Sequence, residues 1–210
     1  MDKKTLEQAF DARFPLEMKD KLREAHVAIA GLGGLGSNIA VMLARSGVGH
    51  LRMIDFDVVD FTNLNRQAYC ISHVGKNKTD ALKEILMEIN PYLDYEFINE
   101  RVTTNNINQL FMGYSIVCEA FDKADQKAML VQEILTHFND IIVVSGNGMA
   151  GFGDSNEIQT RQKMRRLYVC GDGKTDIDDG MGLISPRVTI CAAHQANKVV
   201  QLILQCNCTV

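Results

Sequence analysis

Three glycines near the start of the chain have the spacing of a nucleotide-binding turn. Gly31, Gly33 and Gly36 form a G-x-G-x-x-G pattern at the end of the run 26–36, which begins as an apolar, strand-like segment. In such a turn the first glycine allows a tight bend, the second lets a pyrophosphate approach the backbone, and the third lets the next helix pack on the strand. The N–H groups and positive dipole end of that helix face the anion. The pattern favours a nucleotide site over its alternative, a plain structural turn.

A carboxylate follows at the distance typical of a ribose contact. The run Leu51–Ile54 predicts a second strand, and it ends at Asp55, 24 residues after Gly31. In dinucleotide-binding folds an acidic residue near this offset holds the ribose hydroxyls. Asp57 lies two residues further along the chain. The alternative for both carboxylates is a solvated strand end.

Polar and charged residues behind these strands indicate which nucleotide chemistry is favoured. Asn63, Arg66 and Lys78 follow the second strand, and Asp122 follows the apolar run Ser115–Cys118. A nicotinamide pocket has little use for two cations, whereas attack on an α-phosphate develops negative charge that Arg and Lys offset. A carboxylate such as Asp122 can hold Mg²⁺. The set favours nucleotidyl transfer from ATP over hydride transfer with NAD; surface charges and a helix cap at Asp122 are the alternatives.

Strand-like and helical patterns alternate along the chain and must position these residues. Apolar runs at 26–30, 51–54, 93–97, 115–118 and 141–145 predict strands, and helical patterns start near Gly36 and cover 76–90, about 105–112 and 124–138. This alternation predicts an α/β, Rossmann-like fold with a mostly parallel sheet and helices on both faces. Ligands in such folds bind outside the carboxyl ends of the strands. We therefore expect the glycine loop, Asp55 and Asp122 to lie close together.

The connecting and final segments have weaker patterns. The long aperiodic stretch 56–75 predicts a functional loop, because connections of this length are uncommon in compact domains. The run 159–169 reads as a strand and 171–183, rich in Gly and Asp, as a surface loop. Ser185-Pro186 predicts the start of a well-buried helix over 186–204.

Length and composition limit the class of protein. The 210 residues fit one domain over 1–210, and a net charge of −4 argues against a nucleic-acid partner. No apolar run is long enough for a membrane span and the amino terminus is polar, so we expect a cytoplasmic protein. Six cysteines follow no disulfide spacing and none forms a C-x-x-C pair, so structural zinc is not expected. A site built from Cys170, Cys206 and Cys208 is the alternative.

The motifs occur in one order that resembles a known superfamily. The segments 31–38, 47–49, 54–59 and 63–67, followed by Gly75-Lys76-Asn77-Lys78 and Asn90-Pro91, are similar to the ThiF/MoeB/ubiquitin-activating enzymes over roughly residues 20–150. These enzymes adenylate the C-terminal glycine of ubiquitin-like sulfur carriers. The compact length and the segment Asp172–Ser185 most resemble short ThiF-type proteins of bacterial thiamine biosynthesis.

The resemblance implies a role for each candidate residue. It implies ATP with Mg²⁺ as cofactors, a carrier protein ending in Gly-Gly as partner, and a homodimer. Asp122 would coordinate Mg²⁺, and Arg13 would reach the ATP of a partner subunit; with Arg66 and Lys78 these form the implied catalytic set. The implied nucleotide-binding residues are Gly31, Gly33, Gly34, Gly36, Asp55, Asp57, Asn63, Arg66 and Lys78.

Three departures from the family pattern change what is expected. The two C-x-x-C pairs that often hold zinc are missing, and the loop 172–183 lacks the cysteine that joins some family members to their carrier. Phe121-Asp122-Lys123 replaces the usual Thr-Asp-Asn and keeps only the carboxylate. An NAD-dependent oxidoreductase and a nucleotide-binding module without turnover stay as rival interpretations.

The missing C-x-x-C pairs predict a zinc-independent fold. We expect elemental analysis of the purified protein to give less than one zinc per chain, and the melting temperature to be unchanged by a chelator. One tightly held zinc per chain would contradict this and would point to Cys170, Cys206 and Cys208.

Overall fold

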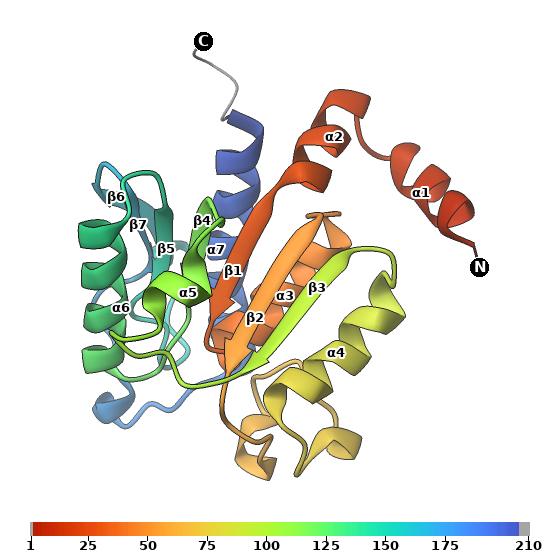
Figure 1. The fold of residues 1–210 in the computed structure, drawn as a ribbon. Helices are drawn as coiled ribbons and strands as arrows, with labels where there is room; N and C mark the ends of the chain where they lie inside the picture. Colours follow the sequence, from red (N-terminus) through yellow and green to blue (C-terminus); the bar gives the residue numbers. More distant parts are fainter. Residues whose placement is uncertain (1, 206–210) are drawn as a thin grey trace.

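The chain folds around one seven-stranded sheet. The computed structural model describes residues 2–205. The strand order is β3-β2-β1-β4-β5-β7-β6, with parallel pairs throughout except for the antiparallel pair of β6 and β7. This confirms the predicted Rossmann-like, mostly parallel α/β fold (Figure 1). The strands are β1 (His26–Ala30), β2 (His50–Asp55), β3 (Asp94–Asn99), β4 (Ile116–Glu119), β5 (Ile142–Gly146), β6 (Gln159–Met164) and β7 (Leu167–Gly171).

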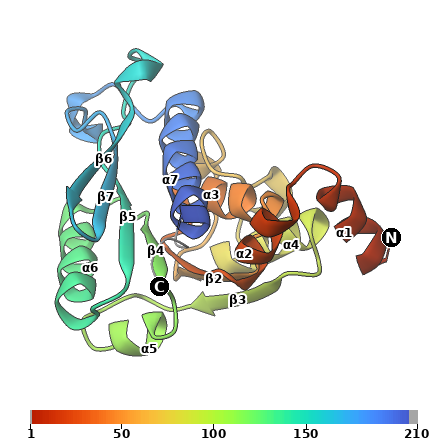
Figure 2. The same ribbon diagram turned by 90° about the horizontal axis from the view of Figure 1, so that it is seen from above.

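Helices cover both faces of the sheet, as predicted (Figure 2). One core cluster joins α2, α3, α4 and α7 to one face, and a second joins α5 and α6 to the other. Successive side chains of a strand point to opposite faces. In β1, Val27 and Ile29 belong to the first cluster, whereas the small Ala28 and Ala30 belong to the second. The helices are α1 (Lys3–Asp11), α2 (Leu16–Glu24), α3 (Gly34–Arg45), α4 (Lys78–Ile89), α5 (Ile107–Phe111), α6 (Ala124–His137) and α7 (Ser185–Gln205).

The last helix, α7, packs along α3 and also contacts α2, β5 and β7. Its apolar side chains Val188, Val199 and Ile203 belong to the same core cluster as the buried side of α3. The Lys21 ammonium of α2 donates to the Leu204 carbonyl at 3.1 Å, across 183 positions of sequence. The segment 186–204 is thus a well-buried helix, as its pattern predicts.

Two parts of the fold differ from the sequence-based expectation. The single strand predicted over 159–169 is a hairpin of β6 and β7, and its turn at Arg165 and Arg166 contains no Gly, Pro or Asn to indicate it. The two short amino-terminal helices were not predicted at all. In α1 the apolar residues are few, and Glu7 holds the helix to the body through Arg23 at 2.8 Å.

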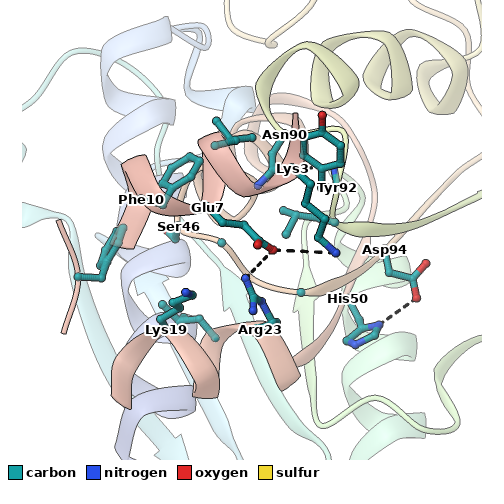
Figure 3. A pocket seen from close by; sticks show the side chains of 16 residues that line it. Lys3, Glu7, Phe10, Lys19, Arg23, Ser46, His50, Asn90, Tyr92 and Asp94 are labelled. Carbon is teal, nitrogen blue, oxygen red and sulfur yellow. Dashed lines mark hydrogen bonds and ion pairs between the residues drawn. The ribbon is translucent and has the colours of Figure 1, made fainter. Parts of the chain in front are cut away.

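A small cavity separates α1 from the sheet (Figure 3). Its volume is about 190 Å³, and its lining includes Phe10, Arg23, His50 and Asp94. His50 and Asp94 begin β2 and β3, so the cavity lies at the amino ends of these strands. Among residues 2–205 no helix is both long and apolar enough to cross a membrane.

The strand order reverses between β1 and β4. Their neighbours β2 and β5 extend the sheet in opposite directions, so the loops after β1 and β4 leave toward opposite faces. In open parallel sheets the ligand crevice forms at such a point, outside the carboxyl ends of the strands. The fold thus provides a crevice where the glycine loop meets the turn after β4.

The third glycine of the loop is expected to be essential for this fold. A Cβ on Gly36 would collide with the carbonyl oxygen of Gly31, whereas one on Gly33 has its nearest neighbour, Gln67 Nε2, at 3.8 Å. Helix propensity alone would favour Gly36→Ala by about 1 kcal/mol. We nevertheless expect a net loss of unfolding free energy of about 1–3 kcal/mol or more, because the collision is with backbone.

Denaturant unfolding of both variants measures this difference. Gly33→Ala is the matched control, because its Cβ has room and the loss of Gly from the helix N-cap should cost only about 0.5–1 kcal/mol. Equal stability of Gly36→Ala and the wild type would show that the close approach of α3 to β1 is not required.

Candidate functional site

The glycine loop joins β1 to α3 by a close turn. Gly31 has a φ of +91°, and a Cβ there would lie 2.8 Å from the Ala120 carbonyl oxygen of the neighbouring turn. Gly33 is the N-cap of α3, and among residues 2–205 no side chain caps the first turn of this helix. The α3 N-terminus can therefore offer its N–H groups to an anion.

Asp55 ties the glycine loop to the end of β2. The carboxylate is 7% exposed; its Oδ2 accepts from the Leu32 N–H at 2.6 Å and its Oδ1 accepts from the Asp57 N–H at 2.8 Å. Tyr69 donates its hydroxyl to the Leu32 carbonyl at 2.9 Å. Burial, and secondly the Asp55 charge, raise the pKa of Tyr69, so this hydroxyl stays protonated. The Asp55 carboxylate keeps lone pairs for a further donor.

Lys78 begins α4 and reaches back to the two carboxylates after β2. Its side chain is 8% exposed, and Nζ lies 2.9 Å from Asp57 Oδ2 and 3.9 Å from Asp55 Oδ2. The Lys78 N–H donates to the Asp57 carbonyl at 2.9 Å, which fixes the helix start beside the strand end. A buried ammonium held by carboxylates is well placed to meet an anionic ligand.

Arg66 and Asn63 lie in the loop 56–75, where short 3₁₀ turns replace an extended loop. Asn63 Oδ1 accepts from the Asp60 N–H at 3.1 Å in a capping box. Arg66 Nη1 donates to the Thr62 carbonyl at 3.0 Å and to Asn65 Oδ1 at 2.9 Å. These are the only hydrogen bonds of the Arg66 guanidinium among residues 2–205, so most of its donors are available.

Asp122 follows β4 and is exposed. Within residues 2–205 it makes no hydrogen bond or ion pair. The N-cap of α6 is Lys123, and no side chain caps this helix. The structure therefore offers no support for Asp122 as a helix cap.

These residues converge on one large cleft at the carboxyl ends of β1, β2 and β4. Its volume is about 700 Å³. Gly36 is not among its lining residues, and Arg13, exposed between α1 and α2, is not either. The sequence-predicted residues that line the cleft are Gly31, Gly33, Gly34, Asp55, Asp57, Asn63, Arg66, Lys78 and Asp122.

A buried ion pair beneath Asp122 has no counterpart in the sequence patterns. Glu119 is fully buried at the end of β4, and Lys127 of α6 donates to its two carboxylate oxygens at 3.1 and 3.0 Å. Ser145 Oγ donates to Glu119 Oε2 at 2.6 Å, and the Phe121 N–H donates to Oε1 at 2.7 Å. Glu119 thereby fixes the turn that carries Asp122. No motif spacing links these residues, which is why sequence reasoning missed them.

A second ion pair lies behind the loop after β7 and was also missed. Arg187 and Asp172 are 3% and 5% exposed, and Arg187 Nη2 lies 2.7 Å from Asp172 Oδ2. Arg187 lies in α7, and the apolar pattern of that helix gives no indication of a buried charge. Burial opposes ionisation of Asp172, but hydrogen bonds from Thr175, Lys174 and Arg187 outweigh it and lower the pKa of Asp172 to about 2. The pair is therefore ionised at neutral pH.

Of the four cysteines within residues 2–205, Cys70 is exposed, and the three buried ones offer little for covalent chemistry. Cys118, Cys170 and Cys191 are buried, and burial raises the pKa of all three, that of Cys191 to about 12. A thiol with a raised pKa is a poor nucleophile at neutral pH. Cys206 and Cys208 lie outside the described residues. Within residues 2–205 no three His, Cys, Asp or Glu side chains are placed to hold a metal ion together.

Comparison with known proteins is consistent with this geometry. The model of the ThiF family matches residues 7–210. Molybdopterin-synthase adenylyltransferase of Salmonella typhimurium is 34% identical over 197 residues, which cover 90% of this chain and 77% of that protein. tRNA threonylcarbamoyladenosine dehydratase of Haemophilus influenzae is 36% identical over 141 residues, which cover 66% of this chain and 53% of that protein. The chain thus spans about half the length of the dehydratase relatives.

Solved structures confirm the fold. The crystal structure of E. coli tRNA N6-threonylcarbamoyladenosine dehydratase in complex with AMP superposes with a TM-score of 0.84 at 23% identity and covers 93% of each chain. At this identity the likeness concerns the fold alone. The molybdopterin-synthase adenylyltransferase match extends over most of both chains. Together with the family match over residues 7–210, it identifies the chain as a member of the ThiF family.

Proposed function

We propose that this protein binds ATP with Mg²⁺ in the cleft and adenylates the C-terminal glycine of a small ubiquitin-like sulfur carrier protein, releasing pyrophosphate. The observation that carries the proposal is the convergence of the glycine loop, the cations Arg66 and Lys78, and the exposed carboxylate of Asp122 on one cleft. A binding surface for a neutral or cationic ligand would not need this combination.

The cleft supports one orientation of the nucleotide. The α3 N-terminus at Gly33 and Gly34 receives phosphate, and Asp55 accepts from the ribose hydroxyls. Asn63, Arg66 and Lys78 then engage phosphate oxygens. Binding of phosphate near Lys78 would compete with its 2.9 Å contact to Asp57 and so draw the ammonium toward the ligand.

The chemistry needs positioning and charge neutralisation more than a protein nucleophile. A carboxylate oxygen of the carrier attacks the α-phosphorus, a new C–O–P bond forms, and the bond from the α-phosphorus to the bridging oxygen of pyrophosphate breaks. The electron pair leaves with pyrophosphate, and Arg66 and Lys78 offset the developing charge. The attacking carboxylate is already ionised at neutral pH, so no general base is required.

Asp122 is the residue suited to the metal. Mg²⁺ binds hard oxygen ligands and is held in nucleotide sites by one or two carboxylates together with phosphate oxygens. The Asp122 carboxylate has no other partner among residues 2–205, faces the cleft and is set on a turn fixed by Glu119. When bound, Mg²⁺ would supply charge neutralisation at the phosphates.

The proposal also covers the kind of carrier protein and the pathway that it serves. The resemblance of the segment Asp172–Ser185 to that of ThiF-type proteins supports a ThiS-like carrier and thiamine thiazole biosynthesis. The family resemblance also supports a homodimer, in which the exposed Arg13 would reach a partner subunit's ATP. An action on tRNA, the substrate in the names of the dehydratase relatives, is the second candidate; a net charge of −4 does not favour it.

The two cations beside the glycine loop predict a preference for ATP. ATP with Mg²⁺ at a hundred times its Kd should raise the unfolding free energy by about 2.7 kcal/mol, and NAD at the same concentration should raise it much less. Thermal unfolding with each ligand measures the difference. Gly33→Ala should fold normally but lose most of the ATP effect, since its methyl group would stand where phosphate meets the backbone. A larger stabilisation by NAD than by ATP would exclude adenylation.

Replacing Asp122 tests whether this residue acts in catalysis rather than in the fold or in carrier binding. Asp122→Ala should leave the fold intact and lower carrier-dependent ATP–pyrophosphate exchange by about 10²–10³-fold, the effect of losing one preorganised charged group. The measurement uses a purified ThiS-type carrier ending in Gly-Gly, with bulk tRNA in a parallel reaction.

Asp125→Ala is the matched control, because Asp125 lies in the first turn of α6 but does not line the cleft. If Asp122→Ala keeps the wild-type rate of ATP–pyrophosphate exchange, the metal ligand must be Asp55 or Asp57 instead. Exchange that responds to tRNA and not to the carrier would favour the second candidate.

A further inference from the structure

Two further loops line the cleft, at the ends of β5 and β7. Asn147–Ala150 follow β5 and Thr175–Ile177 follow β7, and both segments line the cleft. The loops are joined mainly through backbone: the Asp172 N–H donates to the Gly148 carbonyl at 3.0 Å, and the Gly173 N–H donates to the Asn147 carbonyl at 3.1 Å. We call residues 147–153 and 172–183 the far wall.

Arg187 holds the far wall from behind. Its Nη2 lies 2.7 Å from Asp172 Oδ2 and 3.5 Å from Glu157 Oε2, and its Nη1 donates to the Asp154 carbonyl at 2.9 Å. The guanidinium therefore ties α7 to the loop after β7 and to Asp154, the residue directly after the segment 147–153. The Arg187 and Asp172 side chains are 4% and 1% exposed, so water does not screen the pair.

Asp172 connects Arg187 to residues at the surface of the cleft through hydrogen bonds. Its Oδ1 accepts from the Lys174 N–H at 2.8 Å and from the Thr175 N–H at 2.9 Å, and its Oδ2 accepts from the Thr175 hydroxyl at 2.8 Å. The Ala150 N–H in turn donates to Thr175 Oγ1 at 3.1 Å. A chain of hydrogen bonds thus runs from buried Arg187 to Thr175 and Ala150, which line the cleft.

The nucleotide side of the cleft has its own support. Asp55 fixes the glycine loop, and Lys78 is held by the carboxylates of β2. Among residues 2–205, the far wall is joined to the loop of Arg66 by the hydrogen bond from Asn65 Nδ2 to the Leu183 carbonyl at 3.0 Å. Because Asp55 and Lys78 hold the nucleotide contacts without Arg187 or Asp172, we expect a change at either of these two residues to affect the far wall more than the nucleotide contacts.

We propose that Arg187 and Asp172 are positioning residues that shape the far wall for the C-terminal tail of the protein substrate. The inference rests on the proposed adenylation and names the part of the site that takes its acceptor. A wall built largely from backbone at Asn147–Ala150 suits an extended Gly-Gly tail, which has N–H and C=O groups to pair and no side chains to place. Neither Arg187 nor Asp172 touches the reacting atoms.

The test uses Arg187→Lys and Asp172→Asn. Lysine keeps the charge but cannot hold three acceptors in the planar geometry of a guanidinium. Asparagine keeps an acceptor for the Lys174 and Thr175 amides but removes the charge pair. In each variant we expect hydrogen exchange of the Ala150, Lys174 and Thr175 amides to accelerate by about tenfold, the scale of losing one charge-assisted hydrogen bond.

Kinetics separates positioning from a general structural role. In carrier-dependent ATP–pyrophosphate exchange with a ThiS-type carrier, the KM for the carrier should rise by about tenfold, and the Kd for ATP should change less than twofold. Arg161→Gln is the matched control, because Arg161 donates to the Gly171 carbonyl beside Asp172 but does not line the cleft. It should leave both constants unchanged.

Two results would overturn the inference. One is unchanged amide exchange in both variants, and the other is a Kd for ATP that rises in parallel with the KM for the carrier. If the wild-type chain shows no carrier-dependent exchange, the proposed function fails. Accelerated amide exchange would then still establish the ion pair as the support of the far wall, and the acceptor assignment would be refuted.

Discussion

The carboxylate of Asp55 is the contact on which the rest of the site depends. It accepts one N–H from the glycine loop and one from the turn after β2, and Lys78 Nζ lies 3.9 Å away. A buried charge of this kind is stable only when it is well hydrogen-bonded, because desolvation would otherwise neutralise it. Two strand ends and the start of α4 are thereby held in one arrangement. Any ligand that binds Asp55 is placed relative to all three.

Buried ion pairs hold both sides of the cleft in addition. Glu119 with Lys127 fixes the turn that carries Asp122, and Asp172 with Arg187 fixes the loop after β7. Loops are normally the most mobile part of a domain. Anchoring each loop by one charged group, with backbone N–H groups as donors, gives rigid walls around a polar crevice. This is the preorganisation that electrostatic catalysis requires.

The sequence predicted the parts of the fold that depend on local pattern. Alternating apolar runs and helical periods were enough for the sheet from β1 to β5, and for the glycine loop and Asp55, because hydrophobic period and turn chemistry determine both. The sequence predicts one strand where the β6–β7 hairpin lies, since Arg165 and Arg166 carry no turn signal. Arg187 and Lys127 could not be recognised, because their partners lie 15 and 8 positions away at spacings that no motif defines. Tertiary packing alone brings these charges together.

The position of α7 has a consequence for the way the chain folds. This helix completes the core over α3, and Gln195 reaches from it to the carbonyl oxygens of Glu119 and Val144 at the centre of the sheet. During synthesis the apolar side of α3 is made long before residues 185–205, so it stays without its main partner while most of the chain emerges. Contacts so distant in sequence slow folding. Apolar surface that stays exposed in the partly folded chain favours aggregation. Substitutions that weaken α7 should therefore reduce the yield of folded protein in cells more than they reduce the activity of the molecules that do fold.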